Sequence, residues 1–286
     1  MPATDPEKTL QVALVQMCSG RDPVRNTEDA SRLIRAAADN GAQYIQTPEV
    51  TNVMEVDRTA LFAAAEPEPE NKALQSFQAL AKELAIWLHI GSLAIRKTED
   101  KLANRSYLIK PDGNIAARYD KLHMFDVSLA NGETYCESDN YSAGTEAVVA
   151  DTPWGGLGMT ICYDLRFPYL FRALAQGGAR MISVPAAFTQ PTGIAHWRSL
   201  LRARAIETQC FVFAAAQTGT HEHGRKTYGH SLIISPWGEV LAEAEQEPTV
   251  LSATLDLSQI DAVRSRVPSL AADRPFKLTT APISGS

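Results

Sequence analysis

A cysteine, a glutamate and a lysine stand at comparable places in this sequence, each directly after a strand-like run. Cys162 follows the apolar residues 157–161, Glu49 follows the short run 43–47, and Lys121 follows a similar β-rich run. A thiol attacks a carbonyl carbon well only as the thiolate, so it needs a base or a positive environment. The three residue types therefore predict covalent catalysis at a carbonyl carbon, with a nucleophile, a base and a cation.

The residues after Cys162 indicate how its thiol would be held. A Tyr163-Asp164 turn follows, and a helix is expected to start near Pro168. Backbone N–H groups at the amino end of such a segment lower the pKa of a nearby thiol and hold an oxyanion. We therefore expect a depressed pKa for the Cys162 thiol. Taken alone, each of these residues is typical of an ordinary buried or surface side chain, and only their combination favours a site.

The elements that must position these residues alternate between strands, helices and hairpins. Three hairpins are predicted from turn sequences at 111–114, 153–156 and 236–239. The remaining strands are expected at 10–17, 43–47, 87–95, 181–184, 210–216 and 250–257, and the helices at 22–39, 71–85, 169–176, 195–208 and 258–266. Strands outnumber helices, and both hairpins and strand–helix–strand crossovers are present. This order predicts an α/β fold with mixed sheets covered by helices. No linker divides the sequence, so residues 1–286 are expected to form one domain.

Composition excludes several classes of function. The net charge is −6 over 286 residues, so no basic stripe is available to neutralise nucleic-acid phosphates. An apolar content of 45% is ample for a large core, but no apolar run is long enough to span a membrane. Residues 1–10 carry no apolar run, so we expect no export signal. The cysteines show neither pairing nor metal-ligand spacing, which favours reduced thiols in the cytoplasm.

The segments around Glu49, Lys121 and Cys162, in this order, resemble the nitrilase superfamily of carbon–nitrogen hydrolases. The resemblance covers nearly the whole sequence and implies a four-layer α-β-β-α sandwich with two mixed β-sheets. It implies that Glu49 is the general base, that Cys162 forms a thioester, and that Lys121 and the backbone N–H of Tyr163 stabilise the oxyanion. Glu137 matches the second glutamate of the family, which holds the lysine. The implied reaction requires no metal ion and no organic cofactor.

Two carboxylates around one ammonium group would keep Lys121 charged. The pKa of one of these carboxylates would be raised by its neighbour and by burial. We therefore expect one of Glu49 and Glu137 to have a raised pKa.

Residues 163–168 and 185–193 resemble the amidase branch that includes deaminated glutathione amidase and omega-amidase. The resemblance implies hydrolysis of deaminated glutathione to α-ketoglutarate and cysteinylglycine, a metabolite-repair reaction. Such a substrate carries carboxylates, so a cation in the pocket is expected. Arg166, Phe188 and Thr192 are the candidates for substrate binding.

Other functions remain open at this stage. On the same fold the enzyme could instead be an omega-amidase acting on α-ketoglutaramate or an N-carbamoyl-amino-acid amidohydrolase. A glutaminase domain would need a fused ATP-using domain, for which the sequence is too short, and a non-catalytic binding role is disfavoured by the complete set of catalytic residue types. Family members usually pair across a helical face, so we expect a homodimer or a larger even oligomer. The proline-containing tail from about residue 267 is a candidate for the subunit interface.

A few further residues have ordinary structural interpretations. Cys136 is the cysteine of interest among the remaining three, because it neighbours Glu137. His221 and His223 are expected in a solvated loop. Arg166 and Asp164 are expected to form a buried pair that shapes the turn at the nucleophile.

Overall fold

The computed structural model describes residues 9–129, 132 and 134–280. Two six-stranded sheets form its centre, with strand orders β16-β1-β2-β3-β4-β5 and β15-β14-β11-β10-β9-β8. The strands of the first sheet are β1 (Thr9–Gln16), β2 (Tyr44–Gln46), β3 (Trp87–Arg96), β4 (Leu102–Ile109), β5 (Ile115–Asp120) and β16 (Thr249–Asp256). Those of the second are β8 (Val148–Ala150), β9 (Gly156–Met159), β10 (Ala179–Ser183), β11 (Phe211–Ala214), β14 (Leu232–Ile234) and β15 (Val240–Glu243).

Both sheets are mixed, as the alternation of hairpins and crossovers predicted. β1 pairs in parallel with β2 but antiparallel with β16, and β10 pairs in parallel with both β9 and β11. The three predicted hairpins are present as the antiparallel pairs β4–β5, β8–β9 and β14–β15. Parallel neighbours require crossovers, and helices supply the crossovers between the central strands.

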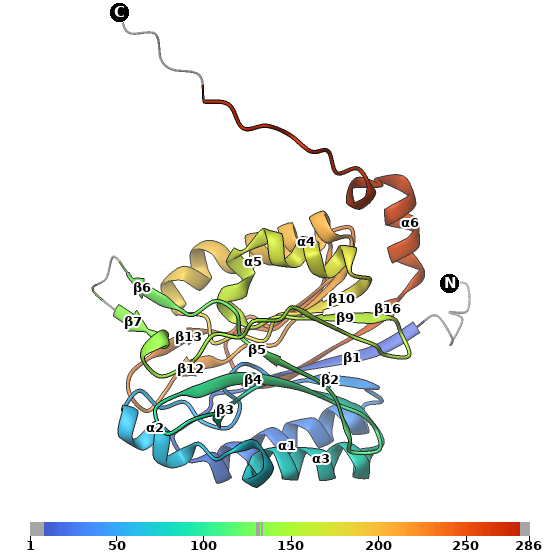
Figure 1. Cartoon of the computed structure of the whole chain (residues 1–286). Helices are drawn as coiled ribbons and strands as arrows, with labels where there is room; N and C mark the ends of the chain where they lie inside the picture. The colour runs from blue at the N-terminus through green and yellow to red at the C-terminus, as the bar shows by residue number, and fades with distance from the viewer. Residues whose placement is uncertain (1–8, 130–131, 133, 281–286) are drawn as a thin grey trace, which may run out of the picture.

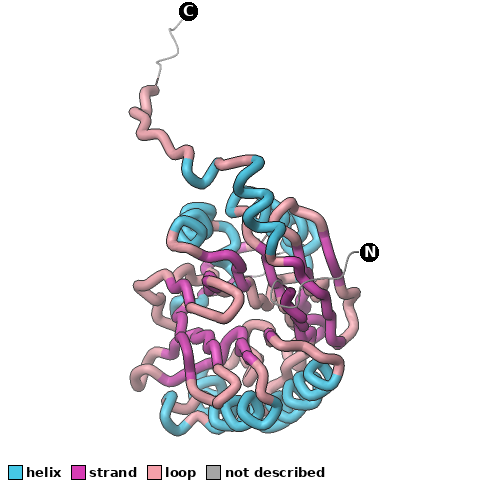
Figure 2. Tube along the Cα trace, turned by 90° about the vertical axis from the view of Figure 1, so that its right-hand side faces the viewer, coloured by secondary structure: helices cyan, strands magenta, loops and turns pink. Residues whose placement is uncertain are grey.

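Helices cover the outer face of each sheet and complete four layers (Figure 1). The helices are α1 (Pro23–Asp39), α2 (Arg58–Ala64), α3 (Lys72–Leu84), α4 (Pro168–Gln176), α5 (Gln190–Thr208) and α6 (Ser258–Arg266). α1 and α3 lie on the first sheet, while α4 and α5 lie on the second. Figure 2 shows the two sheets facing each other between the helical layers. The structure is therefore the α-β-β-α sandwich that the sequence indicated.

The alternation of side chains in β1 explains why two cores form. Leu10, Val12 and Leu14 point into the core between the two sheets, while Ala13 and Val15 point into the core under the helices of the first sheet. Successive side chains of a strand point to opposite faces, so an all-apolar strand is buried on both sides. The site is built at the ends of such strands.

The structure contains short elements that the sequence analysis did not anticipate. These are α2 and two small hairpins, β6 (Asp126–Ser128) with β7 (Thr134–Cys136) and β12 (Thr218–Thr220) with β13 (Lys226–Tyr228). Three-residue strands carry too little alternation to be recognised from sequence. α5 begins at Gln190 rather than 195, because Pro191 occupies the first helical turn, where its missing N–H costs nothing.

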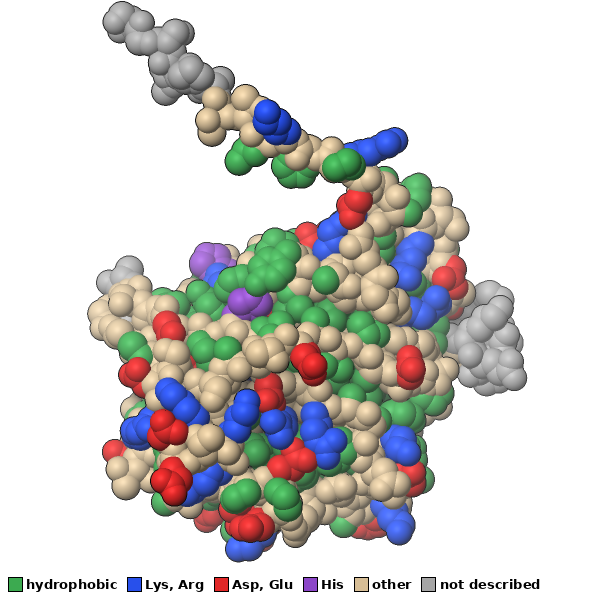
Figure 3. All heavy atoms as spheres, viewed as in Figure 1, with side chains coloured by type: hydrophobic (Ala, Val, Ile, Leu, Met, Phe, Trp, Pro, Cys, Tyr) green, Lys and Arg blue, Asp and Glu red, His purple; other side chains and the backbone are tan. Residues whose placement is uncertain are grey.

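The carboxyl-terminal tail leaves the body beyond α6 and extends away from it (Figure 1). Arg172 of α4 pairs with Asp273, which fixes the root of the tail. Hydrophobic side chains gather over the α4–α5 region and recur along the tail (Figure 3). None of the described helices is both long and apolar enough to cross a bilayer. The expectation about an export signal concerns mainly residues 1–8, which lie outside the described residues.

Candidate active site

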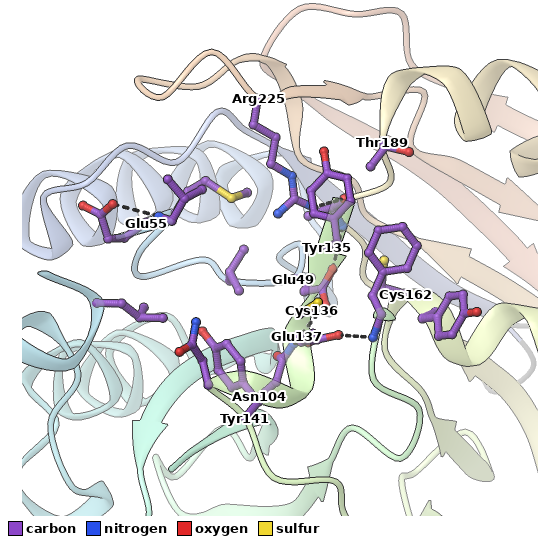
Figure 4. A pocket seen from close by; sticks show the side chains of 18 of the residues that line it. Glu49, Glu55, Asn104, Tyr135, Cys136, Glu137, Tyr141, Cys162, Thr189 and Arg225 are labelled. Atoms are coloured by element: carbon purple, nitrogen blue, oxygen red, sulfur yellow. Dashed lines mark hydrogen bonds between the residues drawn. The ribbon is translucent and has the colours of Figure 1, made fainter. Parts of the chain in front are cut away.

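Glu49, Lys121 and Cys162 meet in one buried cluster although they lie far apart in the sequence. Figure 4 shows Glu49 and Cys162 at this cluster. Glu49 lies shortly after β2, Lys121 directly after β5, and Cys162 opens the 3-10 segment η4 (Cys162–Arg166) after β9. The first two positions belong to one sheet and the third to the other. The stacking of the two sheets therefore assembles the cluster, and no single element carries it.

Lys121 lies between two carboxylates and is almost completely buried. Its Nζ donates to Glu49 Oε1 at 2.8 Å and to Glu137 Oε2 at 2.8 Å. Burial lowers the pKa of Lys121, but the charges of Glu137 and Glu49 outweigh burial and raise that pKa well above its ordinary value. The ammonium group is therefore charged at neutral pH, as expected from the sequence.

Three nitrogen donors hold Glu49, and its carboxylate is the stable form. Oε1 accepts from Lys121 and from Asn104 Nδ2 at 2.9 Å, and Oε2 accepts from the backbone N–H of Ala187 at 2.8 Å. Burial raises the pKa of Glu49, but the charge and hydrogen bond of Lys121, the hydrogen bond from Cys162 and the charge of Arg225 leave that pKa below its ordinary value. The expectation of a raised carboxyl pKa is therefore wrong for Glu49.

Cys162 is buried, and its backbone occupies the left-handed region with φ of 48°. Its thiol donates a hydrogen bond to the Glu49 carboxylate. Burial raises the pKa of the thiol well above its ordinary value, and the negative charge of Glu49 raises it further against the opposing effect of Lys121. The expected depression of this pKa is wrong, because burial and a carboxylate outweigh the nearby N–H groups. At rest the site therefore holds a neutral thiol beside a carboxylate.

Tyr163, whose backbone N–H the sequence analysis assigned to the oxyanion, lies in the first turn of η4. N–H groups in the first turn of a helical segment have no acceptor within the segment. This group belongs to the residue directly after Cys162 in the chain.

Asn104 joins the two carboxylates and was missed by the sequence analysis. Its Nδ2 donates to Glu49 Oε1 at 2.9 Å and to Glu137 Oε1 at 3.0 Å. Glu137 is fixed further by the backbone N–H of Phe125, which donates to Oε2 at 2.7 Å. The only sequence signal was a polar residue at the start of a predicted buried strand, which does not name its partners.

A strained turn aims the Glu49 side chain. Val50 has a φ of 49°, which is unusual for a β-branched residue, and its N–H donates to Ser92 Oγ at 2.8 Å. β3 approaches this turn so closely at Gly91 that an added Cβ would lie 2.2 Å from the carbonyl oxygen of Thr47. Only glycine fits at that contact, so the position of Glu49 depends on the strand behind it.

Asp164 ties the turn at Cys162 to the loop that carries Lys121. Its Oδ2 accepts from the Tyr119 hydroxyl at 2.6 Å and from the N–H of Ile161 at 2.8 Å, and Oδ1 lies 2.6 Å from His123 Nδ1.

The expected Asp164–Arg166 pair is not formed. Arg166 instead lies 3.3 Å from His196 Nδ1 and over the ring of Phe188. Two of the partners that Asp164 takes, Tyr119 and His123, come from the last strand of the other sheet and the loop after it, which sequence proximity does not reveal.

Comparison with known proteins places this geometry in a family. Residues 11–265 match the family model described as carbon-nitrogen hydrolase. The chain belongs to the carbon–nitrogen hydrolase family. A deaminated glutathione amidase from Yersinia enterocolitica is 40% identical over 93% of this chain and 94% of its own length. The human deaminated glutathione amidase is 38% identical over 92% of this chain and 82% of its own length.

Solved structures of the family share the fold. The NitFhit protein of Caenorhabditis elegans superposes with a TM-score of 0.88 and 36% identity, covering 95% of this chain and 66% of that protein. Nit3 of Saccharomyces cerevisiae, described as a member of branch 10 of the nitrilase superfamily, superposes with a TM-score of 0.82 and 28% identity. That match covers 93% of this chain and 97% of Nit3. This chain is therefore a hydrolase of carbon–nitrogen bonds with the nitrilase fold.

In this carbon–nitrogen hydrolase a cavity of about 490 Å³ opens onto the cluster. Its lining includes Phe188 and Thr192, two of the residues expected to bind substrate. Arg166 does not line it, because the ring of Phe188 lies under its guanidinium group. The arginine side chains that line the cavity are instead those of Arg58 and Arg225, neither of which the sequence analysis named.

The remaining cysteine and histidine side chains have different places. Cys136 is exposed and lines the cavity next to Glu137. His221 is buried rather than solvated, since its ring bonds to the carbonyl oxygen of Ser19 at 2.9 Å and to Thr227. His223 Nε2 lies 2.6 Å from Glu55. Within residues 9–129, 132 and 134–280, no three His, Cys, Asp or Glu side chains converge as a metal site would require.

Proposed function

We propose that this enzyme is a thiol amidohydrolase that cleaves deaminated glutathione into α-ketoglutarate and cysteinylglycine. The observation that carries the proposal is the contact of a neutral Cys162 thiol with the Glu49 carboxylate, beside the Lys121 ammonium, at the cavity. The names of the Yersinia and human relatives support this choice of substrate. The cavity volume of about 490 Å³ lies within the usual range for small-molecule sites.

Acylation follows from the resting protonation states. Glu49 removes the thiol proton as Cys162 Sγ attacks the scissile carbonyl carbon, and the carbonyl oxygen becomes an oxyanion. Lys121 and the N–H of Tyr163 donate to that oxyanion, where fixed donors in a dry site are most effective. Glu49 then gives its proton to the leaving amine nitrogen, the C–N bond breaks, and the α-ketoglutaryl thioester of Cys162 remains.

Deacylation uses the same groups. Glu49, again a carboxylate, takes a proton from a water molecule that attacks the thioester carbonyl carbon. Lys121 and Tyr163 stabilise the second oxyanion, the C–S bond breaks, and the thiolate recovers the proton from Glu49. Glu137 and Asn104 act as positioning residues, because their hydrogen bonds fix the positions of Lys121 and Glu49 relative to each other.

Product analysis by mass spectrometry tests the proposal. Wild-type enzyme and Cys162→Ala are each incubated with deaminated glutathione, α-ketoglutaramate and an N-carbamoyl amino acid. We expect rapid release of α-ketoglutarate and cysteinylglycine by the wild type and none by Cys162→Ala. Preference for α-ketoglutaramate would make the enzyme an omega-amidase. Cleavage of only the carbamoyl substrate would overturn the choice of branch, and full activity of Cys162→Ala would overturn the mechanism.

We also propose that the enzyme works in the cytoplasm and assembles as an oligomer. All four cysteines are free thiols, which suits the reducing cytoplasm. The exposed apolar side chains of the α4–α5 face and of the tail favour a homodimer or a larger even oligomer.

A further inference from the structure

Arg225 lies at the cavity wall and forms no ion pair with any residue that the structure describes. It lies directly before β13, lines the cavity, and points toward Tyr135 (Figure 4). Its Cζ lies 5.2 Å from the centre of the Tyr135 ring, and one terminal nitrogen donates to the carbonyl oxygen of Ala187 at 2.9 Å. Its Nε is buried and has no hydrogen-bond acceptor among the described residues.

The other charged groups of the cavity lining have partners of their own, except that no side-chain partner among the described residues is seen for the exposed Asp139. Lys121 is paired with its two carboxylates. Arg58 donates to the carbonyl oxygens of Asp139 and Asp100 and to Asn140. Glu55, the remaining glutamate of the lining, is paired with Arg21 and with His223 on the far side of the cavity mouth. In the described part of the chain, no carboxylate lies within ion-pair distance of Arg225.

A partly buried guanidinium group without a counter-ion is unfavourable, because charges removed from water require a partner. Arginine presents a planar fork of donors that matches a carboxylate in two parallel hydrogen bonds. The Tyr135 ring and the Ala187 carbonyl fix the plane of this fork before any ligand arrives. The site is therefore arranged for an anion that none of the described residues supplies.

The peptide unit of Ala187 connects this cation to the catalytic cluster. Its carbonyl oxygen accepts from Arg225, while its N–H donates to Glu49 Oε2. The positive charge of Arg225 also contributes to the low pKa of Glu49. The guanidinium group thus stays at a fixed distance from the catalytic cluster. A fixed distance of this kind selects substrates by the separation between their carboxylate and their scissile amide.

We propose that Arg225 binds a carboxylate of the substrate and restricts the enzyme to amides that carry an anion several bonds from the scissile carbonyl. This inference rests on the proposed amidase function and names the residue that selects the substrate class. The carboxylate belongs either to the acyl part or to the leaving amine. The chemistry of recognition is the same in both cases.

Steady-state kinetics of Arg225→Gln test the inference with three amides. Deaminated glutathione carries carboxylates on both sides of the scissile bond, α-ketoglutaramate only on the acyl side, and glutaramide carries none. We expect kcat/KM to fall about tenfold to a hundredfold for an anionic substrate, mainly through KM, as for loss of charge-assisted hydrogen bonds. For glutaramide we expect less than about a threefold change. Lys226→Gln, the same charge change at an exposed position of the same hairpin, should leave all three unchanged.

The pattern across substrates locates the carboxylate. A loss with both anionic amides assigns it to the acyl part, and a loss with deaminated glutathione alone assigns it to the leaving amine. Equal losses for glutaramide and the anionic amides, or no loss with any of them, would overturn the inference.

A binding measurement separates this inference from the proposed function. Calorimetric titration of Cys162→Ser protein with α-ketoglutarate and with cysteinylglycine requires no turnover. We expect Arg225→Gln to weaken the binding of one of these products at least about tenfold and Lys226→Gln to weaken neither. If the wild type cleaves none of the amides, the proposed function fails, and this titration still decides the role of Arg225. Unchanged affinity for both products contradicts that role.

Discussion

The pKa directions of Cys162 and Glu49 decide how the thiol becomes a nucleophile. Burial and the neighbouring carboxylate raise the pKa of the thiol, while Lys121, the thiol hydrogen bond and the charge of Arg225 hold the pKa of Glu49 low. A preformed thiolate is therefore not the resting state, which is why the proposed mechanism uses Glu49 as a general base during attack. This arrangement protects the thiol from adventitious alkylation and oxidation, which require the thiolate.

The pH profile of kcat/KM follows from these directions. Because the folded pKa of Glu49 lies below its ordinary value of 4.5, the carboxylate persists above that pKa and is lost only as the pH falls through it. The raised pKa of Cys162 keeps the thiol protonated beyond its ordinary value of 9.0. We expect a flat profile from about pH 6 to 8, with the acid limb below the ordinary glutamate range. An acid limb near about pH 6.5, with the fold intact by circular dichroism, would contradict the assignment.

Asn104 makes a second prediction at this scale. Asn104→Asp replaces the donor between Glu49 and Glu137 with a third carboxylate, which repels both. We expect kcat to fall about a hundredfold or more, since each charged hydrogen bond contributes about 1.5–3 kcal/mol. Stopped assays of product formation check this, with Asn114→Asp in an exposed hairpin turn as the matched control. Retained activity in Asn104→Asp would show that the bridge is dispensable.

Among the elements, Asp164 joins segments from the two sheets. Asp164→Asn keeps the size of the side chain but offers one acceptor oxygen where two serve Tyr119, Ile161 and His123. Loss of a buried charged partner costs about 3–5 kcal/mol, so we expect the free energy of unfolding to fall by about that amount. Urea titration measures it, and Asp151→Asn, at an exposed position, should change it by less than about 0.5 kcal/mol. A similarly small change in the free energy of unfolding for Asp164→Asn would show that Asp164 does not join the two sheets as argued.

Gly91 gives a prediction for the strand behind the base. Gly91→Ala would place a Cβ 2.2 Å from the carbonyl oxygen of Thr47, so the turn that carries Glu49 must move. We expect destabilisation of about 1–3 kcal/mol, typical of overpacking, together with loss of kcat. Thermal unfolding and amidase assays measure both. Gly41→Asn is the control, because nothing lies within 4 Å of that position and asparagine tolerates its positive φ.

The sequence predicted the long elements and the residues that carry the chemistry, because periodic apolar runs and strand-end motifs are local. It did not predict Asn104 or Arg225, whose roles depend on what faces them from another strand or hairpin. It also gave the wrong direction for the pKa of Cys162. The start of a helical segment is visible in sequence, whereas burial and the approach of Glu49 from the other sheet are not.

At the scale of the whole molecule, apolar surface remains on the α4–α5 face and the tail. Tyr169 and Ile194 are 64% and 69% exposed on the helices, and Phe276 and Leu278 are 89% and 81% exposed beyond the root at Asp273. Side chains of this kind are rarely left in water on an extended segment. A second copy of the chain would cover both surfaces, which is the reason for the proposed homodimer.

The tail then contributes directly to the stability of the dimer. Burying Phe276 and Leu278 contributes about 1.5–3 kcal/mol each, and every 1.4 kcal/mol changes a dissociation constant about tenfold. We expect the wild type to sediment as a dimer or larger even oligomer, and Phe276→Ser/Leu278→Ser to raise its dissociation constant at least about tenfold. Lys277→Ser, between the two, should have little effect, because a lysine keeps its charged end in water and contributes less buried apolar area than Phe276 or Leu278. A wild-type monomer would exclude the proposed assembly, and an oligomer indifferent to the double substitution would place its interface elsewhere than the tail.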